Sequence, residues 1–575
     1  MLKRGLPCAA LAAVLVLPTT AGASELLVPG VTHSRELIFN GGRPVVLHVV
    51  RTPPPSDLYR LLPVRARGGD VRRQTVPSMQ RRLSPRATTV GVNGDFFRIE
   101  TGHPTGMYMR NGVLSAPPSR RRSALALGLD GRLLVDLFRF DATWQAVGDR
   151  PRRLHDLNRP VENLPRVGLF TRAWGAATPR ARRAVELVLD GFPQARLGAD
   201  LTGTVVAVER GGRTPIPAGG AVLQARRDKR ELLLAVGSVG TTVTVRLSVP
   251  ELSAGTLEAM GGGPTLVENG GVVPQARQGF SSGHTHDRHP RTAVAQLANG
   301  RLLFVVADGR SSRSHGLTTR ALATILARRG AVTAISLDGG GSSTIAFDGR
   351  VLNVPSDGKP RRVANALFLH YYGIYAPAAN RTVLSPNGDG VRDRKTLTAK
   401  IVRRSDVRLR LRRPNGSVAW SRQAVEEPGW LRRIVSSPGM AEGLWRWEVQ
   451  AVESGTGRLT EMQRAFRVNK TLGHLRLSRE RMWVKPRRGG RLGVSVVLTR
   501  RARLQVLVLG PGGKVRRALF RGERGSGDHA WRWNGKTGAG KVVDAGTYAV
   551  RVTARNQLGA VTLRRSFRVL HAGRG

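Results

Sequence analysis

Cysteine is almost absent from this sequence: its 575 residues include one, Cys8. Cys8 lies within residues 1–23, which are typical of a secretory signal peptide because Lys3 and Arg4 precede an apolar run and small residues precede Ser24. The mature chain would then have no cysteine, which excludes disulfides, thiolate metal sites and cysteine nucleophiles. We therefore expect a protein that is secreted or associated with the cell surface.

Long apolar runs and aromatic residues are also scarce. After residue 23 no run reaches the roughly 18 apolar residues that a membrane helix needs, so no membrane span is expected. Aromatic residues make up 5% of the chain, and no recognised nucleic-acid motif accompanies the basic residues, which argues against specific nucleic acid binding. The oligomeric state is left open.

Acidic residues are few as well: 39 stand against 93 basic residues, and the formal net charge is +54. Arginine accounts for 83 of the basic residues, spread along the whole chain. Coding composition alone can produce such a bias. If the charge is functional, it attracts anionic polymers in a salt-dependent way, and a phosphorylated glycan or another anionic cell-surface polymer suits an exported basic protein best.

The most informative stretch is residues 336–344, which read Ser-Leu-Asp-Gly-Gly-Gly-Ser-Ser-Thr. It places the Asp338 carboxylate beside glycines and hydroxyls on a turn between two apolar runs. Glycine lets a ligand approach the backbone closely, and successive amides can form a nest for an anion. A plain glycine-rich turn is the alternative. The residues expected to bind an anion are Gly339, Gly340, Gly341, Ser342 and Ser343. Ser342 is not expected to be a nucleophile, because the Gly-x-Ser-x-Gly elbow is absent.

The apolar pattern around this stretch predicts a βαβ-like unit. Residues 302–307 and 331–337 have the character of strands, and residues 318–329 have helical spacing between them. Such a unit would present Asp308 and Asp338 at neighbouring strand ends.

A third acidic residue follows another predicted strand, residues 90–93, which leads into Asn93-Gly94-Asp95. Residues 123–250 alternate short apolar runs with Gly and Pro turns, which predicts a strand-rich body. Asp95 and Asp308 could instead be turn residues whose carboxylates accept bonds from local amides.

Several short motifs in this order resemble the phosphodiester glycosidase family, which releases N-acetylglucosamine from a sugar 1-phosphate diester. The resemblance covers roughly residues 32–375. One departure is Ala295, which stands where many members have glycine. The motifs are Asn93-Gly94-Asp95-Phe96-Phe97, Pro104-Thr105-Gly106, Asn111-Gly112, Gly261-Gly262-Gly263-Pro264-Thr265-Leu266, Asn269-Gly270, Arg291-Thr292-Ala293, Asp308-Gly309-Arg310, the run at 336–344, and Arg361 to Leu367.

The resemblance and the chemistry of a sugar phosphodiester together suggest roles for these residues. A phosphate is already a good leaving group, so the site needs a base or nucleophile at the anomeric carbon and positive charge at the phosphate. Asp338 is the first candidate for the carboxylate, and Asp95 and Asp308 compete for a second catalytic role. Guanidinium groups bind phosphate in a bidentate way. The expected phosphate clamps are Arg291 and Arg310, and the expected sugar contacts are Asn93 and Asn365.

A cluster of His284, His286, Asp287 and His289 precedes Arg291. These side chains suit a transition metal, but residues 279–290 also read as a polar loop with surface histidines. We therefore expect no required cofactor and assign no metal ligands. Whether a divalent cation assists is an open question.

Composition changes after residue 375. Residues 376–383 are interpreted as a linker, and residues 384–470 and 471–575 as two immunoglobulin-like β-sandwiches. The second resembles the immunoglobulin-like domain of flagellar hook-capping proteins, through Trp533-Asn534-Gly535-Lys536 and Ala545-Gly546-Thr547-Tyr548. Asn387, Asp389 and Asp393 could bind calcium, although the EF-hand spacing is not met and a structural turn is favoured.

We therefore expect an α+β catalytic domain with a mixed, strand-rich core in residues 24–375, followed by two all-β immunoglobulin-like sandwiches. The resemblance implies an exported hydrolase that cleaves the glycosidic bond of a sugar 1-phosphodiester in an extracellular or cell-wall glycopolymer. The alternative is a non-catalytic protein that binds phosphosugars or an anionic wall polymer. A third hypothesis gives adhesion by residues 376–575 the main role.

Overall fold

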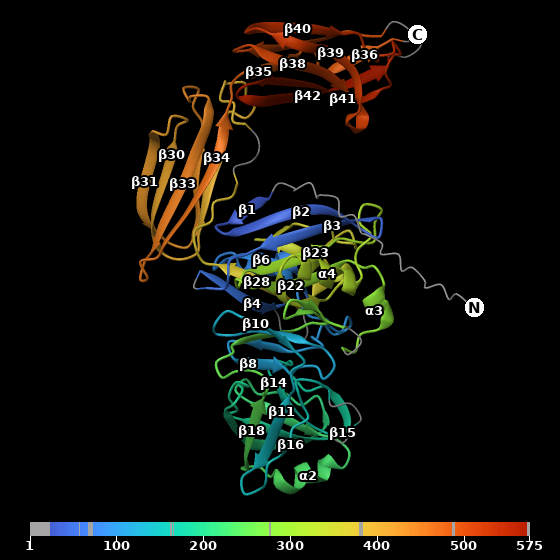
Figure 1. Ribbon diagram of the computed structural model, residues 1–575, viewed down its shortest axis with the longest axis vertical. Coiled ribbons are helices and arrows are strands. Elements are labelled where there is room, and N and C mark those ends of the chain that lie inside the picture. The colour runs from blue at the N-terminus through green and yellow to red at the C-terminus, as the bar shows by residue number, and fades with distance from the viewer. Residues whose placement is uncertain are drawn as a thin grey trace, which may run out of the picture. The chain divides into compact units, whose positions relative to one another are not determined.

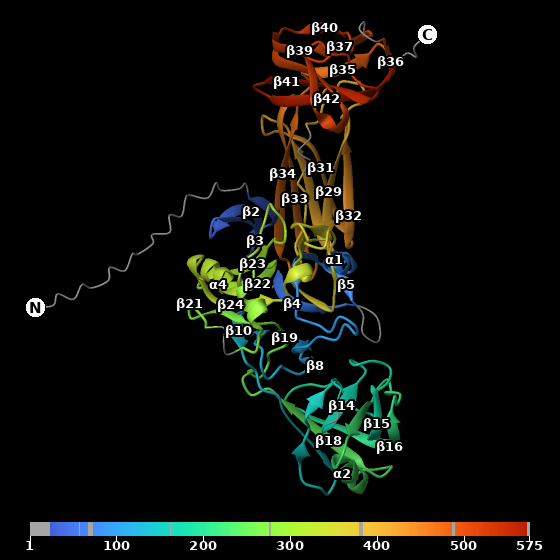
Figure 2. The same ribbon diagram turned by 90° about the vertical axis from the view of Figure 1, so that its right-hand side faces the viewer.

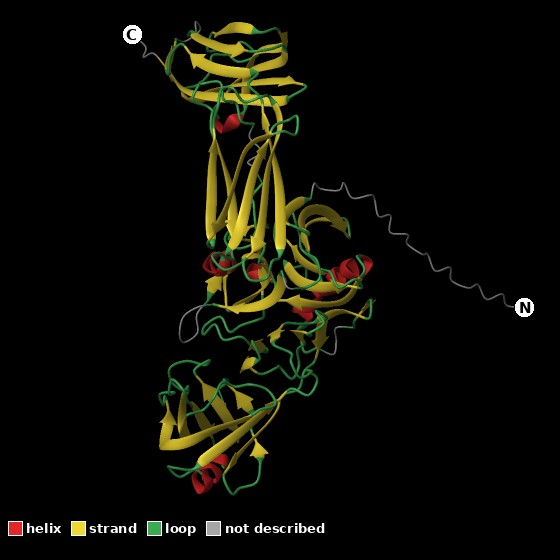
Figure 3. Ribbon diagram, turned by 90° about the vertical axis from the view of Figure 1, so that its left-hand side faces the viewer, coloured by secondary structure: helices red, strands yellow, loops and turns green. Residues whose placement is uncertain are grey.

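The computed structural model describes residues 24–56, 58–66, 73–160, 164, 166–274, 278–378, 383–485 and 489–571. The predicted signal peptide lies outside these residues. The chain divides into two compact units between Tyr372 and Gly373. Strands dominate both units (Figure 3). Within the described ranges no helix is long and apolar enough to cross a membrane.

Helices are few and short. The described part has four α-helices, the longest of ten residues, so the strand-rich core is confirmed while the α+β label fits only loosely. The helices are α1 (Val76–Leu83), α2 (Lys229–Val236), α3 (Ser282–His286) and α4 (Thr319–Arg328).

The largest sheet of the first unit has the order β1-β2-β3-β23-β22-β24-β20-β21. Its strands are β1 (Glu25–Val28), β2 (Val31–Asn40), β3 (Arg43–Arg51), β23 (Leu302–Ala307), β22 (Arg291–Leu297), β24 (Ala331–Leu337), β20 (Thr265–Glu268) and β21 (Gly271–Val272). β22 is antiparallel to both β23 and β24. β23 and β24 are therefore parallel to each other, with β22 between them.

Helix α4 makes the crossover between β23 and β24. The Thr318 hydroxyl caps its N-terminus by accepting a bond from the Ala321 amide at 3.1 Å. Its buried residues include Leu322, Ala323 and Leu326, which pack with β3, β22 and β23 into one apolar core. The crossover brings the C-terminal ends of β23 and β24 and the N-terminal end of β22 to the same edge of the sheet.

A second sheet carries two further site segments, in the order β26-β25-β6-β28-β4. Its strands are β26 (Arg350–Val351), β25 (Ile345–Phe347), β6 (Thr88–Asn93), β28 (Asn365–Tyr371) and β4 (Tyr59–Arg65). Asn93 of β6 lies opposite Ala366 of β28, so Asn93 and Asn365 lie at neighbouring positions. The short pair β27 (Arg362–Val363) and β5 (Gln74–Thr75) precedes β28 and α1 respectively.

The middle of the first unit forms two more sheets. One has the order β10-β9-β19-β7-β8, with β10 (Leu133–Asp136), β9 (Ala124–Leu127), β19 (Glu258–Gly261), β7 (Tyr108–Arg110) and β8 (Val113–Ala116). The other has the order β12-β11-β18-β16-β15-β17-β14-β13, with β12 (Arg152–Arg153), β11 (Asp141–Ala146), β18 (Thr242–Ser248), β16 (Asp200–Gly212), β15 (Arg180–Asp190), β17 (Ala221–Ala225), β14 (Val167–Thr171) and β13 (Asp156–Leu157). Buried Trp144 lies in the shared core, and α2 packs on β15 (Figure 1).

The second unit contains two sandwich-like bodies, each with its own core (Figure 2). The first pairs β29 (Lys395–Ile401) with β32 (Gly429–Val435), and a four-stranded sheet has the order β31 (Val418–Glu426), β30 (Ser405–Arg412), β33 (Gly443–Glu453), β34 (Leu459–Val468). The second has one sheet of β35 (Leu472–Leu477), β37 (Leu492–Leu498) and β40 (Gly527–Trp533), and another of β36 (Arg481–Val484), β42 (Gly559–His571), β41 (Gly546–Asn556), β38 (Ala502–Leu509) and β39 (Val515–Arg524).

The loop with the candidate calcium ligands is held by backbone amides. Asp393 accepts bonds from the amides of Asn387, Gly388 and Gly390, and Asp389 accepts them from Val391 and His474. These contacts fit a structural turn.

Candidate functional site

Asn93 joins three segments at the edge where β6, β22 and β24 meet. Its Oδ1 accepts bonds from the Thr292 hydroxyl at 2.9 Å and the Thr344 amide at 3.0 Å. Its Nδ2 donates to the Asp338 carbonyl at 2.7 Å. The fully buried side chain is thus committed to backbone and strand contacts, in place of the predicted sugar contact.

Asp95 is buried at the end of β6, where its carboxylate accepts two backbone bonds. The donors are the amides of Phe96 and Gly106, each at 2.7 Å. The Asp95 amide in turn donates to Asn365 Oδ1 at 2.8 Å. Asn365 therefore positions Asp95, while Asn365 Nδ2 is buried with no partner within the described ranges.

Glycine is required around this carboxylate because the backbone approaches it closely. A Cβ added to Gly106 would lie 2.7 Å from Asp95 Oδ2, and one added to Gly261 would lie 2.5 Å from it. Both distances are shorter than the van der Waals separation of a carbon and an oxygen atom. The glycines of these two motifs thus leave room for Asp95.

Asp338 follows β24, and its amide donates to the Gly94 carbonyl at 3.0 Å. Burial raises its pKa to about 6, against the lowering effects of the Ser342 hydroxyl and the Arg361 charge. Burial also raises the pKa of Asp95 to about 7, against the lowering effect of the Gly106 amide, and the charge of Asp338 adds to that rise. The two carboxylates therefore influence each other across one site.

The glycine-rich run closes into the 3-10 turn η2 (Gly340–Ser342). The amide of Gly340 donates to the Pro290 carbonyl, and those of Ser342 and Ser343 donate to the carbonyls of Gly339 and Gly340. These three amides are used inside the fold, and the Gly339 amide bonds the Asp338 carboxylate, so an anion site formed by the whole row stays a prediction. The buried hydroxyls of Ser343 and Thr344 remain without a partner in the described part of the chain.

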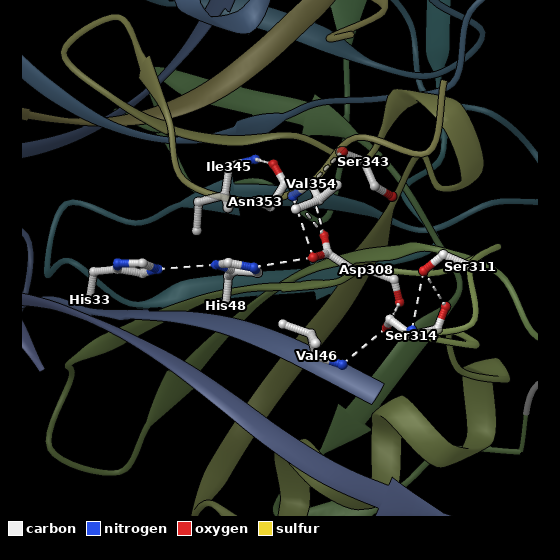
Figure 4. Close-up of polar contacts among 10 residues, drawn as sticks. All are labelled: His33, Val46, His48, Asp308, Ser311, Ser314, Ser343, Ile345, Asn353 and Val354. Atoms are coloured by element: carbon white, nitrogen blue, oxygen red, sulfur yellow. Dashed lines mark hydrogen bonds and ion pairs between the residues drawn. The ribbon is translucent and has the colours of Figure 1, made fainter. Parts of the chain in front are cut away.

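Asp308 is bound by a histidine and by the segment after the glycine-rich turn (Figure 4). Its Oδ2 lies 3.3 Å from His48 Nε2, and its Oδ1 accepts bonds from Asn353 Nδ2 at 3.2 Å and the Val354 amide at 3.1 Å. Asn353 Nδ2 also reaches the Ser343 carbonyl at 3.2 Å. Asp308 therefore supports the loop that carries Ser343, and its catalytic role stays a prediction.

The three arginines near the site differ in how their charge is used. Arg291 is buried and donates from Nε and Nη2 to the carbonyls of Leu317, His284 and Asp287, so its guanidinium holds loops together, and its role as a phosphate clamp stays a prediction. Arg310 is exposed beside the glycine-rich turn, where a Cβ on Gly340 would lie 3.1 Å from its Nη2. Arg361 forms an ion pair with Asp357 at 2.8 Å.

Arg122 is a site residue that the sequence did not single out. Its guanidinium carbon lies 5.3 Å above the ring of Phe96 and 5.5 Å above that of Phe280, and Nη1 donates to the Thr105 hydroxyl at 3.1 Å. Its charge lowers the pKa of both Asp95 and Asp338. Nothing in the run Arg120-Arg121-Arg122 distinguishes it in a chain with 83 arginines.

The histidine cluster is partly helical. His284 lies in α3, its ring stacks on Phe280 at 4.7 Å, and burial, with the charge of Arg291, lowers its pKa to about 4. The polar loop expected at residues 279–290 is therefore interrupted by a packed helix. No group of three or more His, Asp and Glu side chains that could hold a metal occurs among the described residues.

Two family models match this chain. The phosphodiester glycosidase model matches residues 194–370, and the FlgD Ig-like domain model matches residues 485–557. The first match includes Gly261, Asp308, Asp338 and Asn365. Asp95 lies outside it.

Curated proteins and a solved structure are similar to parts of the chain. An uncharacterized SPbeta prophage-derived protein, YomE of Bacillus subtilis, is 40% identical over 84 residues, which are 15% of this chain and 13% of YomE. The N-acetylglucosamine-1-phosphodiester alpha-N-acetylglucosaminidase of Bos taurus is 30% identical over 203 residues, 31% of this chain and 36% of that enzyme. The matched part of the chain thus spans 13% of YomE and little more than a third of the Bos taurus enzyme.

A hypothetical protein from Synechocystis has a similar structure, with a TM-score of 0.52, 24% identity, and coverage of 60% of this chain and 62% of that one. This similarity shows a shared fold. The chain is therefore similar to the phosphodiester glycosidases over residues 194–370 and to the FlgD Ig-like domain over residues 485–557.

Proposed function

We propose that the protein hydrolyses the glycosidic bond of a sugar 1-phosphodiester. One observation carries the proposal: the segments of Asp95 and Asp338 are joined by the bond from the Asp338 amide to the Gly94 carbonyl at 3.0 Å, and both carboxyls are buried near the charge of Arg122. Burial raises the pKa of both carboxyls toward neutrality, where a carboxyl can act as acid or base. The family similarity supports the same reaction class.

Asp338, the first candidate from the sequence, is assigned to the anomeric carbon as base or nucleophile. The bond between the anomeric carbon and the phosphate oxygen breaks, and its electron pair stays on the phosphate. Water supplies the hydroxyl of the free sugar and the proton that the phosphomonoester or the solvent takes. Asp95, whose pKa burial raises to about 7, can share a proton with the leaving oxygen.

Positive charge at the site would stabilise the departing phosphate. The exposed Arg310, beside Gly340, is the candidate clamp, and Arg122 adds charge near both carboxylates. The partnerless hydroxyls of Ser343 and Thr344 offer donors to a bound oxygen. Such preorganised donors and charges provide most of the acceleration when the leaving group is already good.

The finer assignments rest on the sequence. We propose that the substrate is an N-acetylglucosamine-1-phosphodiester-like unit of an extracellular or cell-wall glycopolymer, and that the protein acts outside the cytoplasm. The net charge of +54 supports attraction to an anionic polymer. We keep residues 24–375 as the proposed catalytic domain and residues 384–470 and 471–575 as the two sandwiches.

The test is sugar release from a panel of sugar 1-phosphodiesters, with and without chelator, using the wild type and Asp338→Asn. The panel begins with N-acetylglucosamine diesters. Release by the wild type that the variant lacks supports the proposal, and loss on chelation would add a divalent cation. If folded wild type cleaves no diester but binds one, the protein is a phosphosugar-binding protein and the hydrolase proposal fails.

A further inference from the structure

A cavity of about 250 Å³ lies beside the Asp95 segment and is lined by residues 98–105 of that segment, by the end of β8 and by residues from 158 to 174. Its wall includes Thr105, which precedes the Gly106 amide bound to Asp95. Arg122 Nη1 and Arg159 Nη2 bind the hydroxyl and the carbonyl of Thr105 at 3.1 and 3.2 Å. The cavity and the candidate catalytic carboxylate therefore share one backbone segment.

The charge of this cavity is positive. Arg65, Arg98 and Arg159 line it, and none of the described lining residues is acidic. Arg65 donates to the Ala173 carbonyl, and Arg159 donates to the carbonyls of Pro117, Pro118 and Thr105. The one described ion pair among these arginines joins Arg159 to Asp156 at 3.8 Å.

Partly buried guanidinium groups bound to neutral carbonyls keep much of their charge uncompensated. Burial lowers the pKa of both Arg65 and Arg159, which reflects the cost of holding these charges away from water. Arg98 is exposed and has no hydrogen bond or ion pair from its side chain within the described ranges. An anion in the cavity would offset that cost and give Arg98 a partner.

A flat aromatic wall completes the cavity. The ring of His103 stacks on Trp174 with centroids 3.9 Å apart and planes 7° apart, and both residues line the cavity. Aromatic faces of this kind accept the apolar face of a sugar ring, while Asn158 and Ser115 place polar groups nearby. The size fits a single small unit better than a longer segment.

We propose that this cavity binds a phosphorylated sugar unit of the substrate, next to the unit whose bond is cleaved. The phosphate would pair with Arg98 and Arg159, and the sugar ring would lie near Trp174. This inference rests on the proposed function, because it makes the cavity part of the substrate site. It implies that the substrate is a glycan with phosphate on more than one unit. The binding itself does not depend on turnover.

The test measures binding of glucose 6-phosphate and of glucose by isothermal titration calorimetry, using the full chain with Asp338→Asn so that nothing is turned over. We expect glucose 6-phosphate to bind and glucose to bind at least about tenfold more weakly, since a hydrogen bond to a charged group contributes on that scale. In the same background, Arg98→Ala should weaken the binding of glucose 6-phosphate about tenfold. Arg35→Ala is the matched control, because Arg35 is an exposed arginine of β2 outside the cavity, and it should change nothing.

Equal binding of glucose and glucose 6-phosphate, or equal affinities of the Arg98 and Arg35 variants, would overturn the proposal. Inorganic phosphate is the third probe, and if it binds as tightly as glucose 6-phosphate, the sugar part of the assignment fails. A protein that binds the probe through Arg98 but cleaves no diester would support this inference and overturn the proposed function. If the protein cleaves a diester but does not bind glucose 6-phosphate, the proposed function is supported and this inference is overturned.

Discussion

His48 Nε2 lies 3.3 Å from Asp308 Oδ2, although 260 residues separate the two in the chain. The contact continues outward, since His48 Nδ1 lies 3.2 Å from His33 Nε2. On the other side of Asp308, Asn353 Nδ2 donates to Asp308 Oδ1 and also reaches the Ser343 carbonyl. A buried polar chain therefore runs from β2 to the end of the glycine-rich turn, and Asp308 is its central member.

Replacing His48 by Ala should reduce kcat about tenfold with a smaller effect on KM, because small displacements of a site loop are costly to the reaction. The variant removes one partner of Asp308 and loosens the Asn353–Ser343 contact. The measurement is steady-state sugar release from the best diester of the panel. His33→Ala is the matched control, since it keeps the His48–Asp308 contact, and its kcat should stay near that of the wild type. Equal losses in both variants would contradict a positioning role for the pair.

Asp338→Asn should fold as the wild type does and lose at least about a hundredfold in kcat/KM, the lower range for a group that transfers a proton or attacks. Asn keeps the size and one acceptor of the side chain but cannot ionise. Circular dichroism checks the folding of the variant, and sugar release by the same preparation checks its kcat/KM. A folded variant with activity close to the wild type would remove Asp338 from the mechanism.

The raised pKa of Asp338 also predicts how stability depends on pH. Below its ordinary value of 3.8 the carboxyl is protonated in both states, so folding is unaffected. As pH rises from about 4 to about 6, the unfolded carboxyl ionises before the folded one, and the folded state loses stability until both are ionised. Asp338→Asn removes this loss, so the free energy of unfolding of the variant at pH 8 should exceed that of the wild type by about 3 kcal/mol.

Urea unfolding at pH 3 and pH 8 measures this difference. The two proteins should nearly agree at pH 3, where the carboxyl of the wild type is mostly protonated in both states. A variant that is less stable than the wild type at pH 8 would show that ionised Asp338 is stabilised by its neighbours, contrary to the direction given by burial.

Gly261→Ala should destabilise the protein by about 1–3 kcal/mol, the usual cost of overpacking, and reduce activity. The added Cβ would lie 2.5 Å from Asp95 Oδ2, between backbone segments that have little room to move. Gly219→Ala is the matched control, because no atom lies within 4 Å of the Cβ it would gain. Thermal unfolding and diester cleavage of both variants provide the comparison. Similar stabilities would mean that Asp95 has more space than its contacts indicate.

Local patterns in the sequence predicted local structure well. The strands at 302–307 and 331–337 are β23 and β24 with the same bounds, and the helix at 318–329 is α4 to within a residue at each end. Apolar spacing determines these elements because each buries one face or both. Apolar spacing does not indicate which strand lies between β23 and β24. β22 lies there because it pairs with both of these strands.

Long-range contacts explain what the sequence did not predict at the site. The partners of Asp308 lie at His48 and Asn353, and no spacing rule connects those positions. The amides of the glycine-rich run were expected to be free, but the turn closes on itself and on Pro290. The sequence did not single out Arg122, because arginine is so common in this chain that one more arginine carries little information.

The strands that enter and leave the middle of the first unit are themselves paired. β9 lies beside β19, and Asp141 at the start of β11 pairs with Ser248 at the end of β18. Residues 141–248 therefore form a continuous module that shares its apolar core with β7, β8 and β9, and this module supplies Arg159 and Trp174 to the cavity beside Asp95. Substitutions in this module can change the cavity while the carboxylates and their glycines stay in place. Evolution, or a protein engineer, would in that way have access to new substrates without rebuilding the chemistry.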